Sequence, residues 1–318
     1  MIPFLSICIP TFNRAKFLKA TLESITSEPE FQDSQEVEIL ISNNCSTDET
    51  EEVCQTFVTK YPDKISYQKL NTAISGDENF LKVLNRGNGT FLKLHNDQVL
   101  FQKGSLGRIL GILREQQDCM AIFFLNGGYW PLETTDGAAI SVGFDQFMQK
   151  ARHRATWIGG FCVSAFEFRR VKEPARFSRQ HFGQIGILAD ILDRNGKSAV
   201  IPEQLFVNHP DFTSKREYFI PGVFGTQFKE VTDALIREQK LRPETRDLAQ
   251  YFFLPIINFH FEAEVGWTPA AVYDYFRHML PIYGKKRAFY FWLVRMVLKR
   301  ALRLKSRIGI AGRKRKKA

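Results

Sequence analysis

The sequence predicts an α/β fold whose mostly parallel sheet carries helices on both faces. Over the first 125 residues, short apolar runs alternate with segments in which apolar residues recur at helical spacing. A cluster of polar residues follows three of the apolar runs. Because ligands bind beyond the carboxyl ends of the strands in such sheets, the clusters indicate a ligand site at that edge.

Each expected element follows from its local pattern. Short apolar runs predict strands at Phe4–Ile9, Val37–Ile41, Ile65–Gln68, Thr90–Leu94 and Met120–Leu125. Apolar residues at helical spacing predict helices at Ala15–Ile25, Asp48–Tyr61, Glu78–Leu84 and Leu106–Arg114. Strands that alternate with helices of this length are typical of a parallel sheet.

The three polar clusters are PTFNR at residues 10–14, SNNCSTD at 42–48 and HNDQ at 95–98. Taken singly, each has a structural explanation, because the first two contain residues that cap helices and the third suits a solvated loop. Their recurrence after three separate strands is harder to assign to capping. We therefore expect the clusters to converge on one site.

The composition limits the class of protein. A chain of 318 residues with 44% hydrophobic and 25% charged residues is typical of one large globular domain or two ordinary ones. The five cysteines are scattered without metal-ligand spacing, which predicts reduced thiols in a cytosolic compartment and no zinc site. We expect no signal peptide, since Pro10 interrupts the first apolar run, and no membrane-spanning helix.

The positive charge is concentrated in the C-terminal tail. The chain has a net charge of +10, yet residues 285–318 contain 14 Lys or Arg and no Asp or Glu, so residues 1–284 carry −4. A nucleic-acid groove in the main domain is therefore disfavoured, because its basic patch should belong to the fold.

The tail also contains aromatic and aliphatic residues at near-helical spacing. Phe289, Trp292, Val297 and Leu304 alternate with Lys and Arg. This pattern predicts a basic amphipathic helix at residues 285–318 that lies in the interface of an anionic membrane. A soluble basic helix that caps the domain, or nucleic-acid binding by the tail, is the alternative.

Together the motifs resemble the nucleotide-sugar-dependent glycosyltransferases of family 2, which have the GT-A fold. The resemblance rests on FLSICIPTFNR, EILISNNCSTDET and NFLKVLNRGNGTFLKLHND, in this order and at this spacing. It covers residues 3–125 and continues more weakly to about residue 210. It implies a GT-A (Rossmann-like) domain at 1–215, with a donor-binding half at 1–125 and an acceptor half at 126–215. A helical C-terminal region at 216–284 would precede the tail.

The resemblance implies donor contacts from the first two clusters and the segment before the third. These residues are Pro10, Thr11, Asn13 and Arg14 at the nucleotide, Asn43 and Asn44 at the base and ribose, and Asn79. The family usually has Asp-Asp or Asp-Asn where Asn43 and Asn44 stand. Because an Asn presents either a carbonyl or an NH₂ group, it reads uracil and cytosine equally well, which predicts a UDP- or CDP-sugar donor.

In the third cluster, HND stands where the family carries its Asp-x-Asp motif. Asp97 matches the second Asp, which in the family holds a divalent cation, so the resemblance implies Mg²⁺ or Mn²⁺ at this residue. His95 replaces the first Asp and is expected to contact a ribose hydroxyl or to be a nitrogen ligand for Mn²⁺, with Asn96 beside the donor. This replacement leaves strict metal dependence open.

His209, in LFVNHPDF, is a second candidate ligand for the metal or the diphosphate. The resemblance suggests this role, because many GT-A enzymes use a late His or Asp there. A single His before a Pro is equally compatible with a structural role.

An inverting transfer needs a base that takes the proton of the acceptor hydroxyl. WIGGF at 157–161 resembles the family's acceptor segment, and QIGILADILDRNGK resembles the helix that begins with the family's Glu-Asp pair. Gln184 and Ile185 stand at that pair, and neither is a base. His181 and Asp190 are the nearest candidates, and a residue that the sequence does not identify is the third possibility.

The resemblance implies an inverting glycosyltransferase (EC 2.4), and the tail predicts that it is peripheral on the cytoplasmic face of the plasma membrane. It would transfer a sugar from a nucleotide-sugar to a glycan or lipid-linked glycan of a surface polysaccharide such as lipopolysaccharide or capsule, without a nucleic-acid partner. The alternative is a noncatalytic nucleotide-sugar-binding or assembly protein with a degenerate Asp-x-Asp motif. A nucleotidyltransferase is disfavoured, because no Gly-rich phosphate loop with Lys or Arg follows the first strand.

Overall fold

The computed structural model describes residues 2–125, 137–193, 195–212, 219–261 and 267–315, with side chains up to residue 301. The chain divides into two compact units. The first, here called the sheet unit, comprises Met1–Lys215 and Leu235–Thr245; the second, the helical unit, comprises Arg216–Ala234 and Arg246–Ala318.

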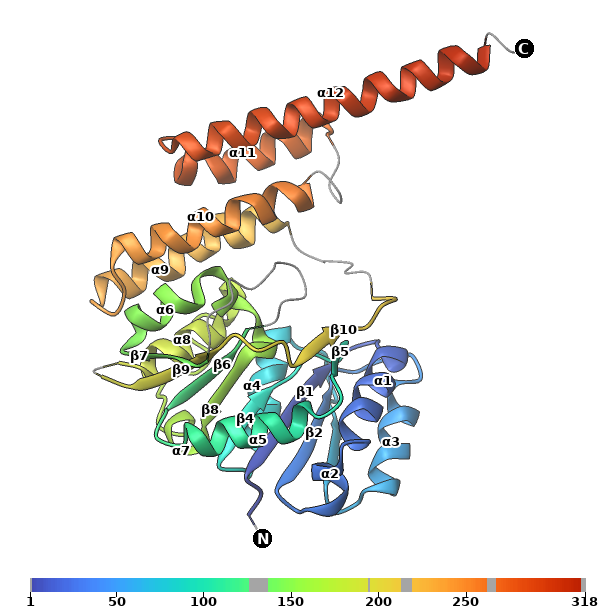
Figure 1. Ribbon diagram of the computed structural model, residues 1–318, viewed down its shortest axis with the longest axis vertical. Helices are drawn as coiled ribbons and strands as arrows, with labels where there is room; N and C mark the ends of the chain where they lie inside the picture. Colours follow the sequence, from blue (N-terminus) through green and yellow to red (C-terminus); the bar gives the residue numbers. More distant parts are fainter. Residues whose placement is uncertain (1, 126–136, 194, 213–218, 262–266, 316–318) are drawn as a thin grey trace. The chain divides into compact units, whose positions relative to one another are not determined.

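The described part of the sheet unit contains an eight-stranded sheet in the order β3-β2-β1-β4-β8-β6-β9-β7 (Figure 1). Its strands are β1 (Leu5–Thr11), β2 (Val37–Asn43), β3 (Ile65–Lys69), β4 (Phe91–Leu94), β6 (Ala121–Phe124), β7 (Ala139–Val142), β8 (Phe161–Ser164) and β9 (Lys197–Ile201). Neighbours are parallel except where β8 pairs with β4 and β6, and where β7 pairs with β9. The carboxyl ends of β1 to β4, β6 and β9 therefore share one edge, here called the carboxyl edge.

A separate two-stranded sheet joins β5 (Val99–Phe101) and β10 (Phe206–Asn208) in antiparallel pairing. β5 follows β4 after the turn of residues 95–98, which carries the third polar cluster. The pairing with β10 therefore brings residues 206–212 to this turn.

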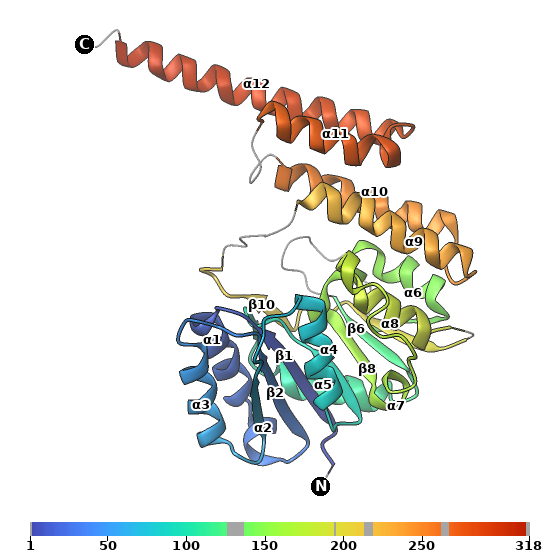
Figure 2. The same ribbon diagram turned by 180° about the vertical axis from the view of Figure 1, so that it is seen from behind.

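Helices cover both faces of the large sheet, as Figures 1 and 2 show. They are α1 (Ala15–Thr26), α2 (Pro29–Asp33), α3 (Thr50–Lys60), α4 (Gly76–Arg86), α5 (Ser105–Glu115), α6 (Phe144–Ala151), α7 (Ala165–Phe168) and α8 (Gly183–Ile191), with the 3₁₀ helices η1 (Arg152–Thr156), η2 (Ile158–Gly160) and η3 (Ser178–Gln180). Residues of α1, α2 and α5 form one hydrophobic cluster with Leu5, Ile7 and Ile9 of β1. α4 packs on β1, β2 and β4 from the opposite face (Figure 2).

The predicted α/β fold, with a mostly parallel sheet and helices on both faces, is confirmed. Every strand and helix expected before residue 125 is present, with bounds that differ by a few residues. α4 begins earlier than expected because Ser75 and Glu78 form a capping box, in which each side chain accepts the N–H of the other residue at 3.2 and 3.0 Å. All five cysteines are free.

The C-terminal region is helical, as the sequence predicts. Its elements are the π-helix η4 (Pro221–Gln227), α9 (Phe228–Arg237), α10 (Pro243–His260), α11 (Pro269–Tyr283) and α12 (Arg287–Arg315). Among the helices in the described ranges, none combines the length and apolar character that a bilayer-spanning segment requires.

The start of α12 is anchored on α11 within the helical unit. Phe289 is fully buried, and its ring stacks on those of Tyr275 and Tyr283 with centroid distances of 6.5 and 6.2 Å. Further along α12, Phe291 and Leu298 are exposed by 63% and 59%. Over residues 287–301, where its side chains are described, α12 therefore has one buried face and one exposed face that carries apolar residues.

Candidate active site

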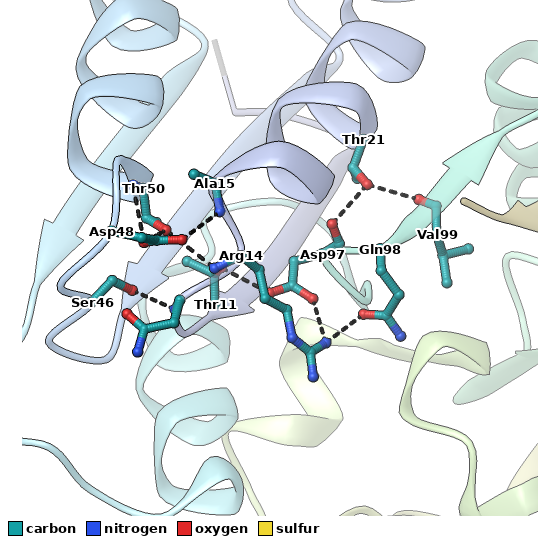
Figure 3. Close-up of polar contacts among 11 residues, drawn as sticks. Thr11, Arg14, Ala15, Thr21, Ser46, Asp48, Thr50, Asp97, Gln98 and Val99 are labelled. Atoms are coloured by element: carbon teal, nitrogen blue, oxygen red, sulfur yellow. Dashed lines mark hydrogen bonds and ion pairs between the residues drawn. The ribbon is translucent and has the colours of Figure 1, made fainter. Parts of the chain in front are cut away.

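The carboxylate of Asp97 is the point where the first and third polar clusters meet, at the carboxyl edge (Figure 3). Thr11 donates its hydroxyl to Asp97 Oδ2 at 2.8 Å, and Arg14 donates from Nη1 to Oδ1 at 2.9 Å. The Asp97 side chain is 5% exposed, whereas that of Arg14 is 37% exposed. A buried anion is thus paired with a cation that solvent and ligands can reach.

Two opposing effects set the ionisation of Asp97. Burial raises its pKa by removing water from the charged form, while the charge of Arg14 and the hydrogen bonds from Thr11 and Arg14 lower it. The net effect is a pKa above the ordinary value of an aspartate. The charged carboxylate therefore depends on a cationic neighbour.

Arg14 is held on several sides. Its Nη1 also donates to Gln98 Oε1 at 2.8 Å, and its guanidinium carbon lies 5.2 Å from the centre of the Phe212 ring. Phe212 reaches this position because the N–H of His209, just after β10, donates to the Gln98 carbonyl at 2.9 Å. Since a guanidinium carries five N–H donors, this pairing leaves donors for an anionic ligand.

His95 closes the turn after β4 from the inside of the protein. The ring is fully buried, with Nε2 2.7 Å from the Val99 carbonyl and Nδ1 3.5 Å from Lys93 Nζ. It packs on Phe101 and Phe206 at centroid distances of 4.9 and 5.5 Å. Burial lowers the pKa of His95 well below its ordinary value, so the ring is neutral. Because both nitrogens are engaged inside the protein, we leave His95 out of the donor and metal site.

Lys93 lies buried beneath the same turn. Its Nζ donates to the carbonyls of Gly159 at 2.8 Å and Leu94 at 3.1 Å, and lies 4.5 Å from the centre of the Phe206 ring. Burial lowers the pKa of Lys93 to about 7. The contact with Gly159 joins β4 to η2, which belongs to the expected acceptor segment.

The second cluster forms the frame of the loop after β2. The buried side chain of Asn43 accepts the N–H of Ser46 at 2.9 Å and donates to the Tyr67 hydroxyl at 3.0 Å. The side chain of Asn44 accepts the N–H of Ile74 at 2.9 Å and donates to its carbonyl at 2.7 Å. These amides are satisfied within the protein, so base recognition by Asn43 stays a prediction that requires a change of hydrogen bonds.

Asn13 and Asp48 join the first cluster to the second. The N–H of Asn13, a residue with φ of +50°, donates to Ser46 Oγ at 2.8 Å. Asp48 accepts the N–H of Ala15 at 3.0 Å and the Thr50 hydroxyl at 2.5 Å (Figure 3). Burial opposes the charged form, but these hydrogen bonds outweigh it and lower the pKa of Asp48. A residue of the second cluster therefore accepts the first N–H of α1, the helix that follows the first cluster.

The remaining expected donor residues also lie at the carboxyl edge. Pro10 stands beside Ser42 at the ends of β1 and β2. Asn79, on α4, accepts the Ser42 hydroxyl at 2.6 Å and donates to the Ser42 carbonyl at 3.1 Å. The buried Oδ1 of Asn96 has no hydrogen-bond partner in the part of the chain that the structure describes.

His209 lies next to the turn that carries Asp97. Its ring packs on Phe17 at a centroid distance of 5.1 Å, and its Nδ1 accepts the N–H of Asp211 at 3.2 Å. In a neutral ring the proton is then on Nε2, which becomes a hydrogen-bond donor. This tautomer suits a phosphate oxygen better than a metal ion.

At the turn after β4, Asp97 is the carboxylate that the resemblance assigns to a cation. Over the described ranges, no group of three or more His, Cys, Asp or Glu side chains is placed to hold a metal ion. Both oxygens of Asp97 already accept hydrogen bonds, from Thr11 and Arg14. Mg²⁺ often binds one or two carboxylates together with substrate phosphates. The residues therefore fit a cation that enters with a diphosphate and displaces Arg14, rather than a preformed metal site.

The two expected bases differ in their surroundings. His181 is exposed, with φ of +63°, and precedes the first turn of α8. Asp190 lies in the last turn of α8, where its Oδ1 is 2.6 Å from Lys240 Nζ and 3.8 Å from Arg176 Nη1. Because its carboxylate is already engaged by Lys240 and lies near Arg176 at the far end of α8 from Gly183, we leave Asp190 out of the catalytic residues.

Sequence reasoning missed three polar residues of this edge. Gln98 belongs to the third polar cluster, and that membership was the sequence signal that could have identified it as a site residue. Thr21 donates to the main-chain carbonyl of Asp97 at 2.9 Å. Asp77, on α4, accepts the N–H of Gly183 at 3.1 Å. Asp77 had no local signal, because its contact joins elements that are far apart in the chain.

A comparison of the sequence with protein-family models finds a family that fits this fold and the residues at the carboxyl edge. The model of glycosyl transferase family 2 matches residues 6–171. Among curated proteins, the abequosyltransferase RfbV of Salmonella typhimurium is 33% identical over 114 residues, which cover 36% of this chain and 34% of RfbV. The GalNAc(5)-diNAcBac-PP-undecaprenol beta-1,3-glucosyltransferase of Campylobacter jejuni is 31% identical over 111 residues, 34% of each protein. The chain thus matches about a third of the length of these relatives.

Two solved structures resemble the fold over most of the chain. Residues 1–349 of TarS from S. aureus, in complex with UDP-GlcNAc, give a TM-score of 0.61 at 14% identity and cover 86% of this chain and 79% of that one. The mannosyltransferase PcManGT from Pyrobaculum calidifontis, in complex with GDP-Man and Mn²⁺, gives a TM-score of 0.51 at 14% identity and covers 94% and 87%. The expected GT-A fold is confirmed.

Proposed function

Because the chain belongs to glycosyl transferase family 2 and is a glycosyltransferase, we propose that it transfers one sugar from a nucleotide-diphosphate donor to a glycan of a surface polysaccharide. The observation that carries this proposal is the buried Asp97 carboxylate, held by Thr11 and Arg14 at the carboxyl edge. It stands where the family motif has its second Asp. The sheet unit would supply the transferase domain, with the donor half at 1–125 and the acceptor half at 126–215.

Arg14 is proposed to bind the diphosphate of the donor. Its guanidinium is partly exposed, and α1 begins at the next residue, so the partial positive charge of a helix N-terminus lies beside it. His209 would donate from Nε2 to the same diphosphate. Charge-assisted hydrogen bonds of this kind are about twice as strong as neutral ones.

Asp97 is proposed to hold a divalent cation, Mn²⁺ or Mg²⁺, that enters with the donor. When bound, the ion would neutralise the charge that develops on the departing diphosphate. The PcManGT structure, which has the same fold, contains Mn²⁺ and GDP-Man together. In the free protein Arg14 supplies the positive charge at this carboxylate.

The donor is proposed to be a UDP- or CDP-sugar and the acceptor a lipid-linked glycan. The TarS structure contains UDP-GlcNAc, and the name of the Campylobacter relative includes an undecaprenol-linked glycan. We propose an inverting displacement, in which the acceptor hydroxyl oxygen attacks the anomeric carbon and the nucleoside diphosphate leaves from the opposite face.

We further propose that α12 attaches the protein to the inner face of the plasma membrane. The apolar side chains of Phe291, Val294 and Leu298 are exposed beside Arg295 and Lys299. Apolar side chains flanked by cations suit the interface of an anionic bilayer. Residues 285–318 would form this peripheral anchor.

A donor screen tests the proposed function. UDP-GlcNAc, UDP-glucose, UDP-galactose and CDP-glucose are offered with and without Mn²⁺; a donor that binds raises the melting temperature, and the sugar released by hydrolysis reports turnover.

Asp97→Asn should lower turnover by at least about a hundredfold while the fold is retained, because one charge is removed, the amide oxygen still accepts from Arg14, and the Thr11 hydroxyl can accept from the amide NH₂. Asp63→Asn, an exposed carboxylate between α3 and β3, is the matched control. Wild-type turnover in the Asp97 variant, with the same response to Mn²⁺, would contradict the assignment.

A further inference from the structure

Asp77 places a carboxylate at the N-terminus of α8. Its Oδ2 accepts the N–H of Gly183, the first residue of α8, at 3.1 Å. The two helices are in close contact there, since a β-carbon on Gly183 would lie 2.9 Å from the Phe80 ring and 3.3 Å from Asp77 Oδ2. α4 and α8 both begin at the carboxyl edge, because α4 follows β3 and α8 precedes β9.

A second polar group at the same helix start lacks a partner. Gln184 is 1% exposed, and its Nε2 donates to the Thr156 carbonyl at 2.9 Å. Its Oε1 is buried and has no hydrogen-bond partner within the described ranges. An unpaired buried acceptor costs free energy unless a ligand or water supplies a donor. We therefore infer that this oxygen accepts a hydrogen bond from a hydroxyl of a ligand.

A series of contacts joins this helix start to Asp97. Gln184 holds Thr156 at the end of η1, and Gly159 of η2 follows three residues later. A β-carbon on Gly159 would lie 2.5 Å from Asn96 Oδ1, so Asn96 lies directly against η2. Asn96 precedes Asp97. The segment of η1 and η2 therefore contacts both Asn96, which precedes Asp97, and Gln184, which follows the glycine that Asp77 binds.

The carboxylate of Asp77 is partly buried and has no ion-pair partner among the residues that the structure describes. Burial raises its pKa to about 7, the Gly183 N–H lowers it, and the charge of the neighbouring Glu78 raises it. The positive charge of Arg179, on η3, stabilises the charged form of Glu78. His181 lies between η3 and α8. The group thus differs from Asp190, which lies within 4 Å of the cationic groups of Lys240 and Arg176.

We propose that Asp77 is the catalytic base of the transfer, in place of the acidic pair that Gln184 and Ile185 replace. The proposal rests on the proposed function. The Asp77 carboxylate takes the proton of the acceptor O–H, whose oxygen forms the new bond to the anomeric carbon. The bond from that carbon to the diphosphate oxygen breaks, and the nucleoside diphosphate leaves with its electron pair. Gln184 Oε1 positions the acceptor by accepting a second hydroxyl.

Donor hydrolysis, with water as the acceptor, tests this role. Turnover of UDP-GlcNAc, UDP-glucose, UDP-galactose and CDP-glucose is measured from about pH 5.5 to about pH 9. Wild-type turnover should rise with pH and level off above about pH 7, because the base must be unprotonated. Asp77→Asn should lose this dependence and lower turnover by about 10²- to 10⁴-fold. The UDP affinity and the melting temperature of this variant should equal those of the wild type, because the Asn side chain still accepts the Gly183 N–H.

The matched variants separate the outcomes. Asp77→Glu should retain part of the activity and the acid limb of the pH profile, and Asp63→Asn should behave as wild type. Unchanged turnover and pH profile in Asp77→Asn would overturn the role of Asp77 alone, as would loss of the acid limb in His181→Ala. A wild-type chain that hydrolyses none of the donors would overturn the proposed function itself, and the role of Asp77 with it.

Discussion

Arg14 has the electrostatic task at Asp97 that we propose a divalent cation takes over when the donor binds. The carboxylate is buried and its pKa is raised, so its charged form needs a positive partner at all times. In the free protein that partner is Arg14, at 2.9 Å. In the proposed mechanism, a donor that brings a cation would release Arg14 to the diphosphate and so couple donor entry to a change of ion pair.

Lys93 makes the stability of the sheet unit depend on pH. Its pKa in the folded protein is about 7, below the ordinary value of 10.5. Between these values the unfolded chain binds a proton that the folded chain lacks, so the free energy of unfolding rises with pH. The slope is at most about 1.4 kcal/mol per pH unit.

Lys93→Met should abolish this rise in the free energy of unfolding between about pH 7 and about pH 8.5. At higher pH the cysteines of the unfolded chain ionise while the buried thiols do not, which lowers the free energy of unfolding, so the window ends below that range. The lost bond to Gly159 changes the stability at both pH values alike, so the slope is the quantity to read. Urea denaturation at the two pH values measures it. Lys82→Met, which removes an exposed lysine of α4, is the control and should keep the wild-type slope; an unchanged slope in the Lys93 variant would contradict the prediction.

At the scale of elements, the sequence predicts what local periodicity determines. β1 to β4, α1, α3, α4 and α5 have their own apolar repeats, and each was expected near its observed bounds. β5 is three residues long and is stabilised by pairing with β10. No local pattern reports a partner that lies in another part of the chain, so this sheet was missed.

The same distinction applies to the candidate site. The clusters predicted that Thr11, Arg14 and Asp97 meet, because strand order alone brings the carboxyl ends together. They did not predict that His95 turns into the core or that Asn43 holds Ser46. The direction of a side chain after a strand depends on the tertiary packing around it, which spacing does not encode.

The apolar face of α12 is an element whose role can be tested without disturbing the fold. Phe291→Ser combined with Leu298→Ser should weaken binding to vesicles that contain phosphatidylglycerol by at least about tenfold, since each exposed side chain would lose about 1 kcal/mol or more of burial. Added salt should weaken wild-type binding, because the basic residues meet anionic headgroups.

Phe259→Ser on α10, where the phenylalanine is 58% exposed, is the matched control and should bind as wild type. Co-sedimentation measures all three proteins. Equal binding of the double variant, or no binding of the wild type, would contradict the anchor. Deleting residues 285–318 is less informative, since it removes Phe289 from its contacts with Tyr275 and Tyr283.

At the scale of the whole molecule, the chain divides into two compact units. The residues of the candidate site, Asp77 and α8 all belong to the sheet unit. Ligand binding to one unit stabilises that unit by mass action. The two units should therefore respond differently to nucleotides.

Calorimetry should resolve two unfolding transitions, of which UDP raises one. At a UDP concentration about a hundredfold above its dissociation constant, the stabilisation is about 2.7 kcal/mol, or a shift of roughly 5 °C or more for a domain of this size. Asp77→Asn should show the same shift, because it keeps the donor site. Equal shifts of both transitions would show that the nucleotide does not bind to the sheet unit alone.

The pairing of β10 with β5 sets the moment at which the proposed donor site could form during synthesis. The segment that matches the family model ends at residue 171, before β10 and His209 have been translated. At about 5–20 residues per second, the ribosome needs roughly 5 to 20 seconds to pass from Phe101 to Asn208. Throughout that interval the nascent chain exposes the apolar face that Phe206 later covers, so the turn with Asp97 is among the last parts of the sheet unit to mature.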